Sequence, residues 1–253
     1  MKLHIATYNI HKGVSWFAQK PRIHDMRAAL QSLDADLLFL QEVQGQHDRR
    51  AQRHEHWPSE GQHDYIAGDR RQAAYGMNAT YQHGHHGNAL LSRYPILHYK
   101  NQDVSDHRFE ERGILHCVVQ MLEKEVHCYV VHFGLFAAGR RRQTDLLIQS
   151  IHSGTPPDAP LIIAGDFNDW RNHLSEPLRQ QLGVEEVFEH LSIQRIGRPK
   201  QAKAAMTFPV GAPFLPLDRI YVRGIQIKSA KVLQGSPWAR LSDHAPLTAD
   251  LEL

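Results

Sequence analysis

The sequence predicts an α/β protein in which two largely antiparallel sheets pack face to face and helices cover their outer faces. Short apolar runs bounded by turn residues recur along the whole chain of 253 residues, at the close spacing typical of antiparallel strands. Two segments between these runs carry apolar residues at helical spacing instead. Ionisable or amide side chains stand at the ends of several runs, where rigid strands hold functional groups accurately.

The expected strands comprise, in chain order, residues 3–10, 35–42, 87–92, 96–99, 114–121, 126–131, 161–164, 217–222 and 245–251. One apolar stripe has 3-4-3 spacing and consists of Ile23, Met26, Leu30 and Leu33. This spacing predicts an amphipathic helix that covers the first sheet. A second helix is expected from about residue 140 to residue 150, with Leu147 and Ile151 buried and its arginines facing outward.

Composition limits the classes of protein to consider. The formal net charge is only +2, whereas a dedicated duplex binder usually carries a strongly basic face. No apolar run approaches the length of a transmembrane helix. The first six residues leave no room for a charged region followed by an apolar signal core. We therefore expect a cytoplasmic protein without a transmembrane segment, and the sequence predicts no protein partner.

The polar strand ends are spread from Asn9 to His244, so one site draws on both ends of the chain. Residues 1–253 are therefore expected to form a single domain. Cys117 and Cys128 fall in two adjacent expected strands. Buried free thiols are the expectation for only two cysteines, and a cross-strand disulfide is the alternative.

Four segments place polar side chains at strand ends, and these side chains are Asn9, Glu42, Asp166 with Asn168, and Asp243 with His244. Carboxylates hold a hard divalent cation or take a proton from water. An amide orients that water, and an imidazole exchanges a proton or donates to an oxyanion. Each segment alone has an ordinary explanation, such as a solvated strand end or an Asx turn. Their occurrence together, in this order, favours metal-assisted hydrolysis.

These segments and their order resemble the endonuclease/exonuclease/phosphatase superfamily, which includes deoxyribonuclease I, exonuclease III, neutral sphingomyelinases and inositol polyphosphate 5-phosphatases. The resemblance covers nearly the whole chain and implies a deoxyribonuclease I-like, four-layer α/β sandwich. His132 resembles the residue that contacts the scissile phosphate, and Asp218 resembles the residue that fixes the imidazole of His244. Asn88 and Arg112 resemble weaker family positions that bind the substrate phosphate.

The resemblance implies attack of water on phosphorus with in-line displacement. Glu42, helped by Asn9 and Asp243, is expected to hold Mg²⁺ or Mn²⁺, whose charge stabilises the phosphoryl oxygens and the departing alkoxide.

The catalytic residues implied are Asp166, Asn168, His244, Asp218 and His132. Asp166 is expected to activate or position the water, which Asn168 orients. His244 is expected to bind a phosphate oxygen and handle a proton, while Asp218 fixes its tautomer. Whether Asp166 or His244 is the general base stays open.

The first motif departs from the pattern of repair nucleases. Asn9 and Gly13 are separated by three residues, one more than those enzymes usually have. This longer form resembles the lipid-type and small bacterial branches, so the favoured substrate is a lipid headgroup or a small phosphodiester. The second hypothesis is an endo- or exonuclease acting on DNA or RNA. The third is a non-catalytic scaffold of the same fold, which should lack a key side chain, and here all are present.

Aromatic side chains after the motifs suggest an apolar lip for a lipid or a base, with core packing as the alternative; they are Trp16, Phe17, Phe133 and Phe136. The densest part of the 19 histidines falls at residues 83–86. No cysteine lies close by, and adjacent histidines cannot easily share one tetrahedral ion, so a loop at the cleft rim is favoured over a zinc site. Protonated below about pH 6.5, such a loop would attract phosphate. Scattered solvated arginines are expected in the basic runs at 49–50, 70–71, 140–142 and 198–203.

Overall fold

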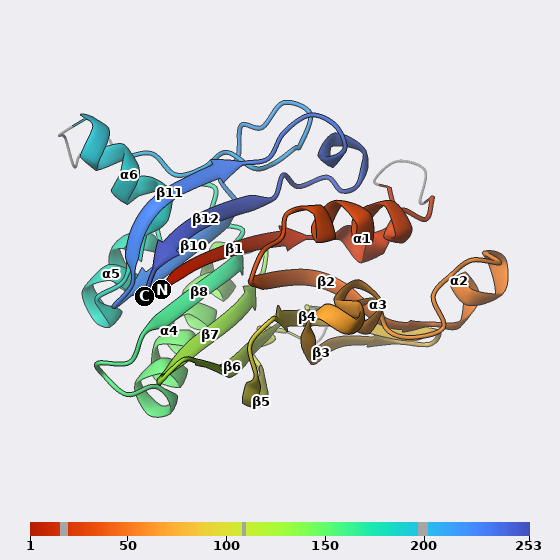
Figure 1. Cartoon of the computed structure of the whole chain (residues 1–253), viewed down its shortest axis with the longest axis horizontal. Coiled ribbons are helices and arrows are strands. Elements are labelled where there is room, and N and C mark those ends of the chain that lie inside the picture. The colour runs from red at the N-terminus through yellow and green to blue at the C-terminus, as the bar shows by residue number, and fades with distance from the viewer. Residues whose placement is uncertain (16–19, 108–109, 197–201) are drawn as a thin grey trace.

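Two six-stranded sheets form the centre of the protein in the computed structural model, which describes residues 1–15, 20–107, 110–196 and 202–253 (Figure 1). The first sheet has the order β11 (Gln226–Val232), β12 (Leu247–Glu252), β1 (Lys2–Asn9), β2 (Leu37–His47), β4 (Gly84–Ser92) and β3 (Gln72–Tyr81). The second has the order β5 (Ile96–Asp103), β6 (Gly113–Met121), β7 (Lys124–His132), β8 (Leu161–Asp166), β10 (Asp218–Arg223) and β9 (Glu185–Glu186).

Each sheet contains one parallel pair of strands, and its other neighbours are antiparallel. In the first sheet β1 runs parallel to β2, and α1 (Ile23–Ser32) connects them. In the second sheet β7 runs parallel to β8, and α4 (Ala137–Gly154) connects them. Parallel neighbours require such a crossover, whereas antiparallel neighbours do not. The predicted largely antiparallel sheets are therefore confirmed.

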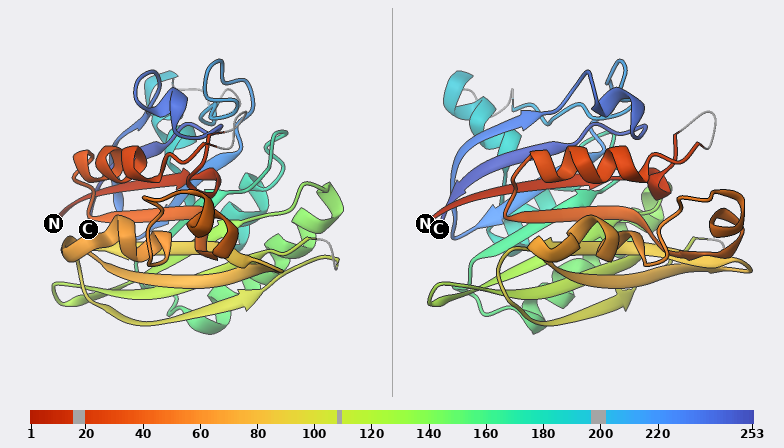
Figure 2. Two further views of the ribbon diagram at one scale, coloured as in Figure 1. Left: turned by 90° about the vertical axis from the view of Figure 1, so that its right-hand side faces the viewer. Right: turned by 45° about the vertical axis from the view of Figure 1, so that its right-hand side comes forward.

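Three apolar layers hold these elements together. Figure 2 shows the arrangement of the sheets and helices from two further directions. Alternate side chains of the strands, such as Ile5 of β1 and Ala164 of β8, meet in a core between the sheets. The outer face of the first sheet, including Tyr8, packs against Met26 of α1. The outer face of the second sheet packs against Leu147 of α4. The result is the four-layer sandwich that the sequence predicts, and burial of apolar area is its main source of stability.

The remaining helices lie around the sandwich and are α2 (Asp48–Arg53), α3 (Gln62–Ala67), α5 (Ser175–Leu182) and α6 (Val187–Ile196), with short 3₁₀ turns η1 (His11–Gly13), η2 (Gly68–Arg70) and η4 (Trp238–Arg240). The two termini lie side by side, and the Met1 amino group donates to the Leu253 carbonyl at 2.8 Å (Figure 1). Within the described part of the chain, every helix is too short or too polar to cross a bilayer.

The structure confirms the predicted strands and both helices, and it corrects several details. Strands β3, β9 and β11 were not expected, and α4 begins three residues before Arg140. Arg140 is buried and not solvated: its guanidinium donates to the Leu135 carbonyl and lies over the ring of Trp170, 4.7 Å from its centroid. Arg71 is also buried, where its guanidinium donates to the Ala35 carbonyl at 2.6 Å.

The two cysteines are free thiols, as expected. Cys117 and Cys128 face each other across β6 and β7, and both are fully buried in the core between the sheets. Phe133 belongs to the outer core of the second sheet, where it packs edge-on against Phe167, so it forms no lip. Phe136 is exposed, whereas Trp16 and Phe17 lie outside the described residues.

Gly165→Ala tests how closely β7 and β8 approach each other. Gly165 has a φ of +151°, and an added Cβ would lie 2.0 Å from the Val131 carbonyl oxygen. Because that oxygen belongs to backbone, we expect a loss of roughly 2–4 kcal/mol in the free energy of unfolding.

The matched control is Gly211→Ala, since an added Cβ there meets no atom within 4 Å. Its effect should stay within about 1 kcal/mol. Urea unfolding followed by circular dichroism compares the two variants, and equal midpoints would contradict the close approach.

Candidate active site

Three of the predicted site residues form a row across the second sheet. His132 is the last residue of β7 and pairs in register with Asp166, the last residue of β8. Asp166 pairs in turn with Asp218, the first residue of β10. Alternation along each strand points all three side chains to the same face as the core between the sheets. The site is therefore the polar end of that core.

Asn9 reaches this row from the first sheet. It ends β1 and lies on the same side of that strand as Leu3 and Ile5, toward the second sheet. Its Nδ2 donates to Asp166 Oδ2 at 3.2 Å and lies 3.5 Å from Glu42 Oε1. The amide therefore connects the carboxylates of two different sheets.

The sequence suggested that Glu42 ends its strand. In the structure Glu42 instead lies inside β2, at a bulge. The register of β2 with β4 shifts between Leu40 and Val43, and Glu42 has a left-handed φ of 54°. A bulge redirects a side chain that would otherwise follow the strand alternation, and here it turns the carboxylate toward Asn9.

His244 lies in the loop before β12 and contacts both carboxylates of the row. Its Nδ1 is 2.8 Å from Asp218 Oδ2, and its Nε2 is 3.7 Å from Asp166 Oδ2. Burial opposes charge on this imidazole, but Asp218 and Asp166 outweigh burial and raise its pKa to about 10. The bond to Asp218 thus fixes the orientation of the ring and favours its doubly protonated form.

Burial also changes the proton affinity of the other two members of the row. Burial raises the pKa of the Asp166 carboxyl to about 7, although the His244 ring opposes this shift. The pKa of His132 is held well below its usual value, first by burial and next by the charge of Arg112. His132 Nε2 lies 3.6 Å from Asp166 Oδ2, so a neutral imidazole faces this carboxylate.

Asn168 and Asp243 support this arrangement from the adjoining loops. The Asn168 backbone N–H donates to Asp166 Oδ1 at 2.9 Å, and its side-chain amide donates to the Phe133 carbonyl. Ser242, which sequence reasoning left without a role, donates from Oγ to the Asn9 carbonyl at 2.7 Å, and the same Oγ lies 3.2 Å from Asp243 Oδ1. These bonds attach the C-terminal loop to the end of β1.

Sequence reasoning also missed two basic side chains of the site, although both lie in the first motif. Lys12 Nζ is 3.0 Å from Glu42 Oε2. His11 Nδ1 is 3.5 Å from Asp243 Oδ1. Burial alone would raise the pKa of Glu42, but the charge of Lys12 holds it well below its usual value. Both side chains belong to the turn that follows Asn9, and this position in the sequence could have pointed to them.

Asn88 and Arg112 occupy one wall of the site. The Asn88 amide crosses between the sheets and donates to the carbonyls of Gly113, at 2.9 Å, and Val130, at 3.4 Å. Arg112 Nε donates to the Phe133 carbonyl at 3.2 Å. The amide of Asn88 thus positions the segment next to Arg112, and binding of phosphate by either residue stays a prediction.

The histidine cluster at 83–86 differs from the expected loop, because β4 already begins at Gly84. His85 Nδ1 lies 2.9 Å from the Tyr75 hydroxyl. The pKa of His86 is lowered to about 4, first by burial and then by Lys12. His86 is therefore neutral at pH 6.5, which contradicts the expectation of a charged patch for this residue.

The side chains of the site include oxygen atoms that could hold a hard divalent cation. Oε2 of Glu42 is buried and accepts no well-directed hydrogen bond from any described residue, and a cationic group, Lys12 Nζ, already lies beside it. Oxygen donors of this kind suit Mg²⁺ or Mn²⁺. Asp166, Asp218 and His244 also bring ligand atoms within 4.8 Å of one another. The direct contact between His244 and Asp218 leaves no room for an ion between them, so Glu42 fits the role better.

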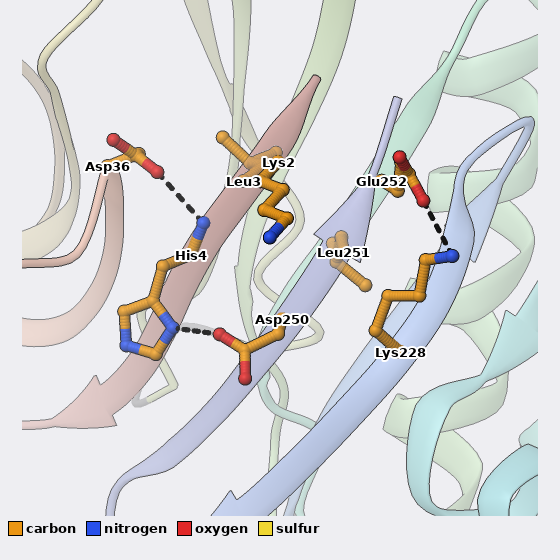
Figure 3. A pocket seen from close by; sticks show the side chains of 8 residues that line it. All are labelled: Lys2, Leu3, His4, Asp36, Lys228, Asp250, Leu251 and Glu252. Carbon is orange, nitrogen blue, oxygen red and sulfur yellow. Dashed lines mark hydrogen bonds and ion pairs between the residues drawn. The ribbon is translucent and has the colours of Figure 1, made fainter.

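A hollow at the other end of β1 offers no comparable chemistry (Figure 3). There His4 pairs with Asp250 at 2.7 Å and Lys228 pairs with Glu252 at 2.6 Å. Asp36 accepts from the His4 backbone N–H at 2.8 Å, so the carboxylates of this hollow already have partners, and none of the predicted site residues lines it.

Comparison with known proteins bears on this arrangement. A family model described as "Endonuclease/Exonuclease/phosphatase family" matches residues 6–244. The chain belongs to the endonuclease/exonuclease/phosphatase family. Members of this family are generally hydrolases that act on phosphoester bonds, typically with a divalent metal, and include both phosphodiesterases and nucleases.

The chain is 42% identical over 252 residues to the uncharacterized protein YbhP of Escherichia coli K12, a match that covers 98% of this chain and 96% of YbhP. An endonuclease/exonuclease/phosphatase structure from Bacteroides vulgatus matches with a TM-score of 0.75, 18% identity and coverage of 100% and 99%. D. rerio TDP2 complexed with a single-strand DNA product matches with a TM-score of 0.71, 18% identity and the same coverage. At this identity, the two structures establish the fold alone.

Asp218→Asn tests the electrostatic coupling at His244. Since the folded-state pKa of His244 is raised above its ordinary value, the coupling stabilises the protein fully below about pH 6.5 and is lost as the pH rises through about 10. The stability difference between wild type and Asp218→Asn should therefore be larger at pH 6 than at pH 9.5. Urea unfolding measures it, and NMR titration of the ring should show a lower His244 pKa in the variant.

Asp250→Asn is the matched control, because it removes the carboxylate partner of His4 from an exposed pair. An exposed pair contributes little, so its effect should be below about 1 kcal/mol at both pH values. A pH-independent loss in Asp218→Asn would contradict the coupling.

Proposed function

We propose that this protein is a divalent-metal-dependent phosphodiesterase that directs water onto phosphorus. One observation carries the proposal: side chains from both sheets and the C-terminal loop converge on the buried carboxylate of Asp166. Asn9, His132 and His244 lie 3.2, 3.6 and 3.7 Å from its Oδ2. Such convergence of titratable groups with shifted pKa values is typical of catalytic sites.

Glu42, with Asn9 and Asp243, would hold the cation, and the metal when bound supplies charge that stabilises the phosphoryl oxygens and the departing alkoxide. Each of these ligands has a neighbour that fixes it. The bulge in β2 aims Glu42, and the bond from Ser242 fixes the end of β1. Supporting contacts of this kind determine how precisely the ligand side chains of a site are positioned.

Asp166 is the group we assign to the water. Burial raises its pKa to about 7, so near neutral pH it accepts a proton more readily than an ordinary carboxylate does. Its Oδ1 is held by the Asn168 backbone N–H, and its Oδ2, which also accepts from Asn9, is the oxygen that faces both imidazoles and that we assign to the reacting water. Asn168 would orient that water through its carbonyl oxygen, because its amide nitrogen donates to Phe133.

His244 is the group we assign to the phosphate oxygen. With Nδ1 on Asp218, its Nε2 carries a proton toward the same space as Asp166 Oδ2. Neutral His132 and the guanidinium of Arg112 would contact the remaining phosphate oxygens. Preorganised donors aimed at developing charge are usually the largest contribution to such catalysis.

Large apolar side chains are exposed in loops that follow or precede the site strands of the second sheet, and they favour a diester that carries an apolar group, as a phospholipid does. Leu135 and Phe136 follow β7, Trp170 follows β8, and Phe214 precedes β10; their exposed fractions are 54, 66, 39 and 66%. Large apolar side chains exposed together usually mark a binding surface.

A nuclease is the second candidate, because Lys12 and Arg112 add positive charge beside the catalytic row. Nucleic-acid binding would weaken steeply with salt, whereas turnover of a lipid would depend on the exposed apolar side chains of Leu135, Phe136, Trp170 and Phe214.

Asp166→Asn and His244→Ala should each reduce hydrolysis of bis-p-nitrophenyl phosphate by roughly 100-fold or more, because each removes a group that touches the reacting atoms. The assay compares Mg²⁺, Mn²⁺ and EDTA, with p-nitrophenyl phosphate as the monoester. Diester cleavage that EDTA abolishes is the expected result for wild type.

Asp158→Asn is the control, since it removes an exposed carboxylate at the opposite end of β8. It should retain wild-type activity. Near-full activity in folded Asp166→Asn, or equal loss in Asp158→Asn, would contradict the assignment.

A further inference from the structure

The turn after Asn9 has an unusual backbone. His11, Lys12 and Gly13 have φ values of 45°, 58° and 66°, so three consecutive residues are left-handed and two of them are not glycine. Side chains with a Cβ avoid this region, because Cβ approaches the following carbonyl oxygen. Such a conformation persists only where the surroundings impose it, and it clusters at functional sites.

The surroundings of this turn do impose it. The Lys12 carbonyl accepts from Gln62 Nε2 at 2.9 Å and from Arg50 Nη1 at 3.3 Å. The Gly13 carbonyl accepts from the Arg22 N–H at 2.8 Å. The His11 N–H donates to Asn9 Oδ1 at 3.1 Å. Contacts from α2, α3 and the segment before α1 therefore fix a turn of only three residues.

The consequence of the turn is the position of the Lys12 ammonium. It lies 3.0 Å from Glu42 Oε2, and Glu42 is itself left-handed, with φ of 54°. Both members of this ion pair thus occupy unfavourable backbone conformations, which a partly exposed ion pair does not compensate. Since the contact is too weak to explain the strain, the strain points to a role for Lys12 in the reaction.

Glu42 is also the carboxylate assigned to the divalent cation, and an ammonium cannot stay beside it once a doubly charged ion binds there. Repulsion between unit charges at about 4 Å is several-fold stronger in a partly buried site than in water. Lys12 has a flexible stem, and its side chain is 31% exposed, so the ammonium can move away without unfolding the turn. The anion that enters the same site is the substrate phosphate.

We propose that Lys12 is a phosphate-binding residue that rests on Glu42 in the metal-free protein and transfers to a phosphate oxygen when a divalent cation takes that carboxylate. This inference rests on the proposed metal-dependent function. It assigns an order, because phosphate binds well only after the cation has released Lys12. The left-handed turn holds the ammonium within reach of both positions.

The test measures binding and not turnover. Isothermal titration calorimetry gives the affinity for Mn²⁺ of the metal-free protein, and then the affinity for inorganic phosphate of the Mg²⁺-saturated protein. Lys12→Met keeps an unbranched side chain, one atom shorter, and removes the charge. We expect it to bind Mn²⁺ about tenfold more tightly and phosphate about tenfold more weakly than wild type does.

Two control variants distinguish the direct contact between Lys12 and Glu42 from the overall electrostatic potential of the site. Lys12→Arg keeps the charge and should keep both affinities within about threefold of wild type. Arg112→Gln removes a positive charge from the same wall, but its guanidinium donates to the Phe133 carbonyl and not to Glu42. It should therefore weaken phosphate binding and change Mn²⁺ affinity much less than Lys12→Met does.

The outcomes distinguish this inference from the function on which it rests. Unchanged Mn²⁺ and phosphate affinities in Lys12→Met, with Mn²⁺ binding abolished in Glu42→Gln, would overturn the role of Lys12 and leave the metal site intact. Wild-type Mn²⁺ affinity in Glu42→Gln would overturn both. Equal Mn²⁺ effects in Lys12→Met and Arg112→Gln would also overturn the inference, because they would indicate the overall electrostatic potential alone.

Discussion

The site depends on one buried carboxylate and on what is required to keep it buried. Asp166 is only 2% exposed, and burial raises its pKa. An isolated buried carboxylate is costly, so donors must surround it. Asn9 comes from the first sheet, and His244 comes from the C-terminal loop. Correct packing of the two sheets is therefore a condition for the chemistry, and the residues that hold Asp166 are also those that hold the layers together at this end.

Strand register carries this requirement to the rest of the fold. His132, Asp166 and Asp218 are neighbours because β7, β8 and β10 pair without a shift, and a slip of one residue would turn the row away from the first sheet. Where a side chain must point in a different direction, the backbone departs from regular strand geometry. It does so at Glu42, in the bulge of β2, and at Lys12, in its left-handed turn. Regular strands thus position Asn9, His132, Asp166 and Asp218, and irregular backbone positions Glu42 and Lys12.

Much of the fold was predictable, because apolar strands such as residues 161–164 and the stripe of the first helix have clear patterns. β3 was missed because its buried residues are only Ala74, Gly76 and Ala79, which form no apolar run, and β11 because Ile227 is its one buried residue. The row of His132, Asp166 and Asp218 was predictable from the order of the motifs. The bulge at Glu42, the burial of Arg140 and the contact between Lys12 and Glu42 depend on tertiary packing, which no local pattern encodes. Among the residues that the structure describes, seven non-glycine residues are left-handed, and sequence reasoning anticipated none of them, although four belong to this site: His11, Lys12, Glu42 and Asn168.

Anomalous diffraction from crystals grown with Mn²⁺ tests the central claim most directly, because it places the ion without assuming a substrate. The account predicts a single strong peak within coordination distance of the Glu42 carboxylate, on the side of Asn9 and Asp243, with the Lys12 ammonium displaced from its position at 3.0 Å. A peak between Asp218 and His244, or no peak at Glu42 at saturating Mn²⁺, would contradict it.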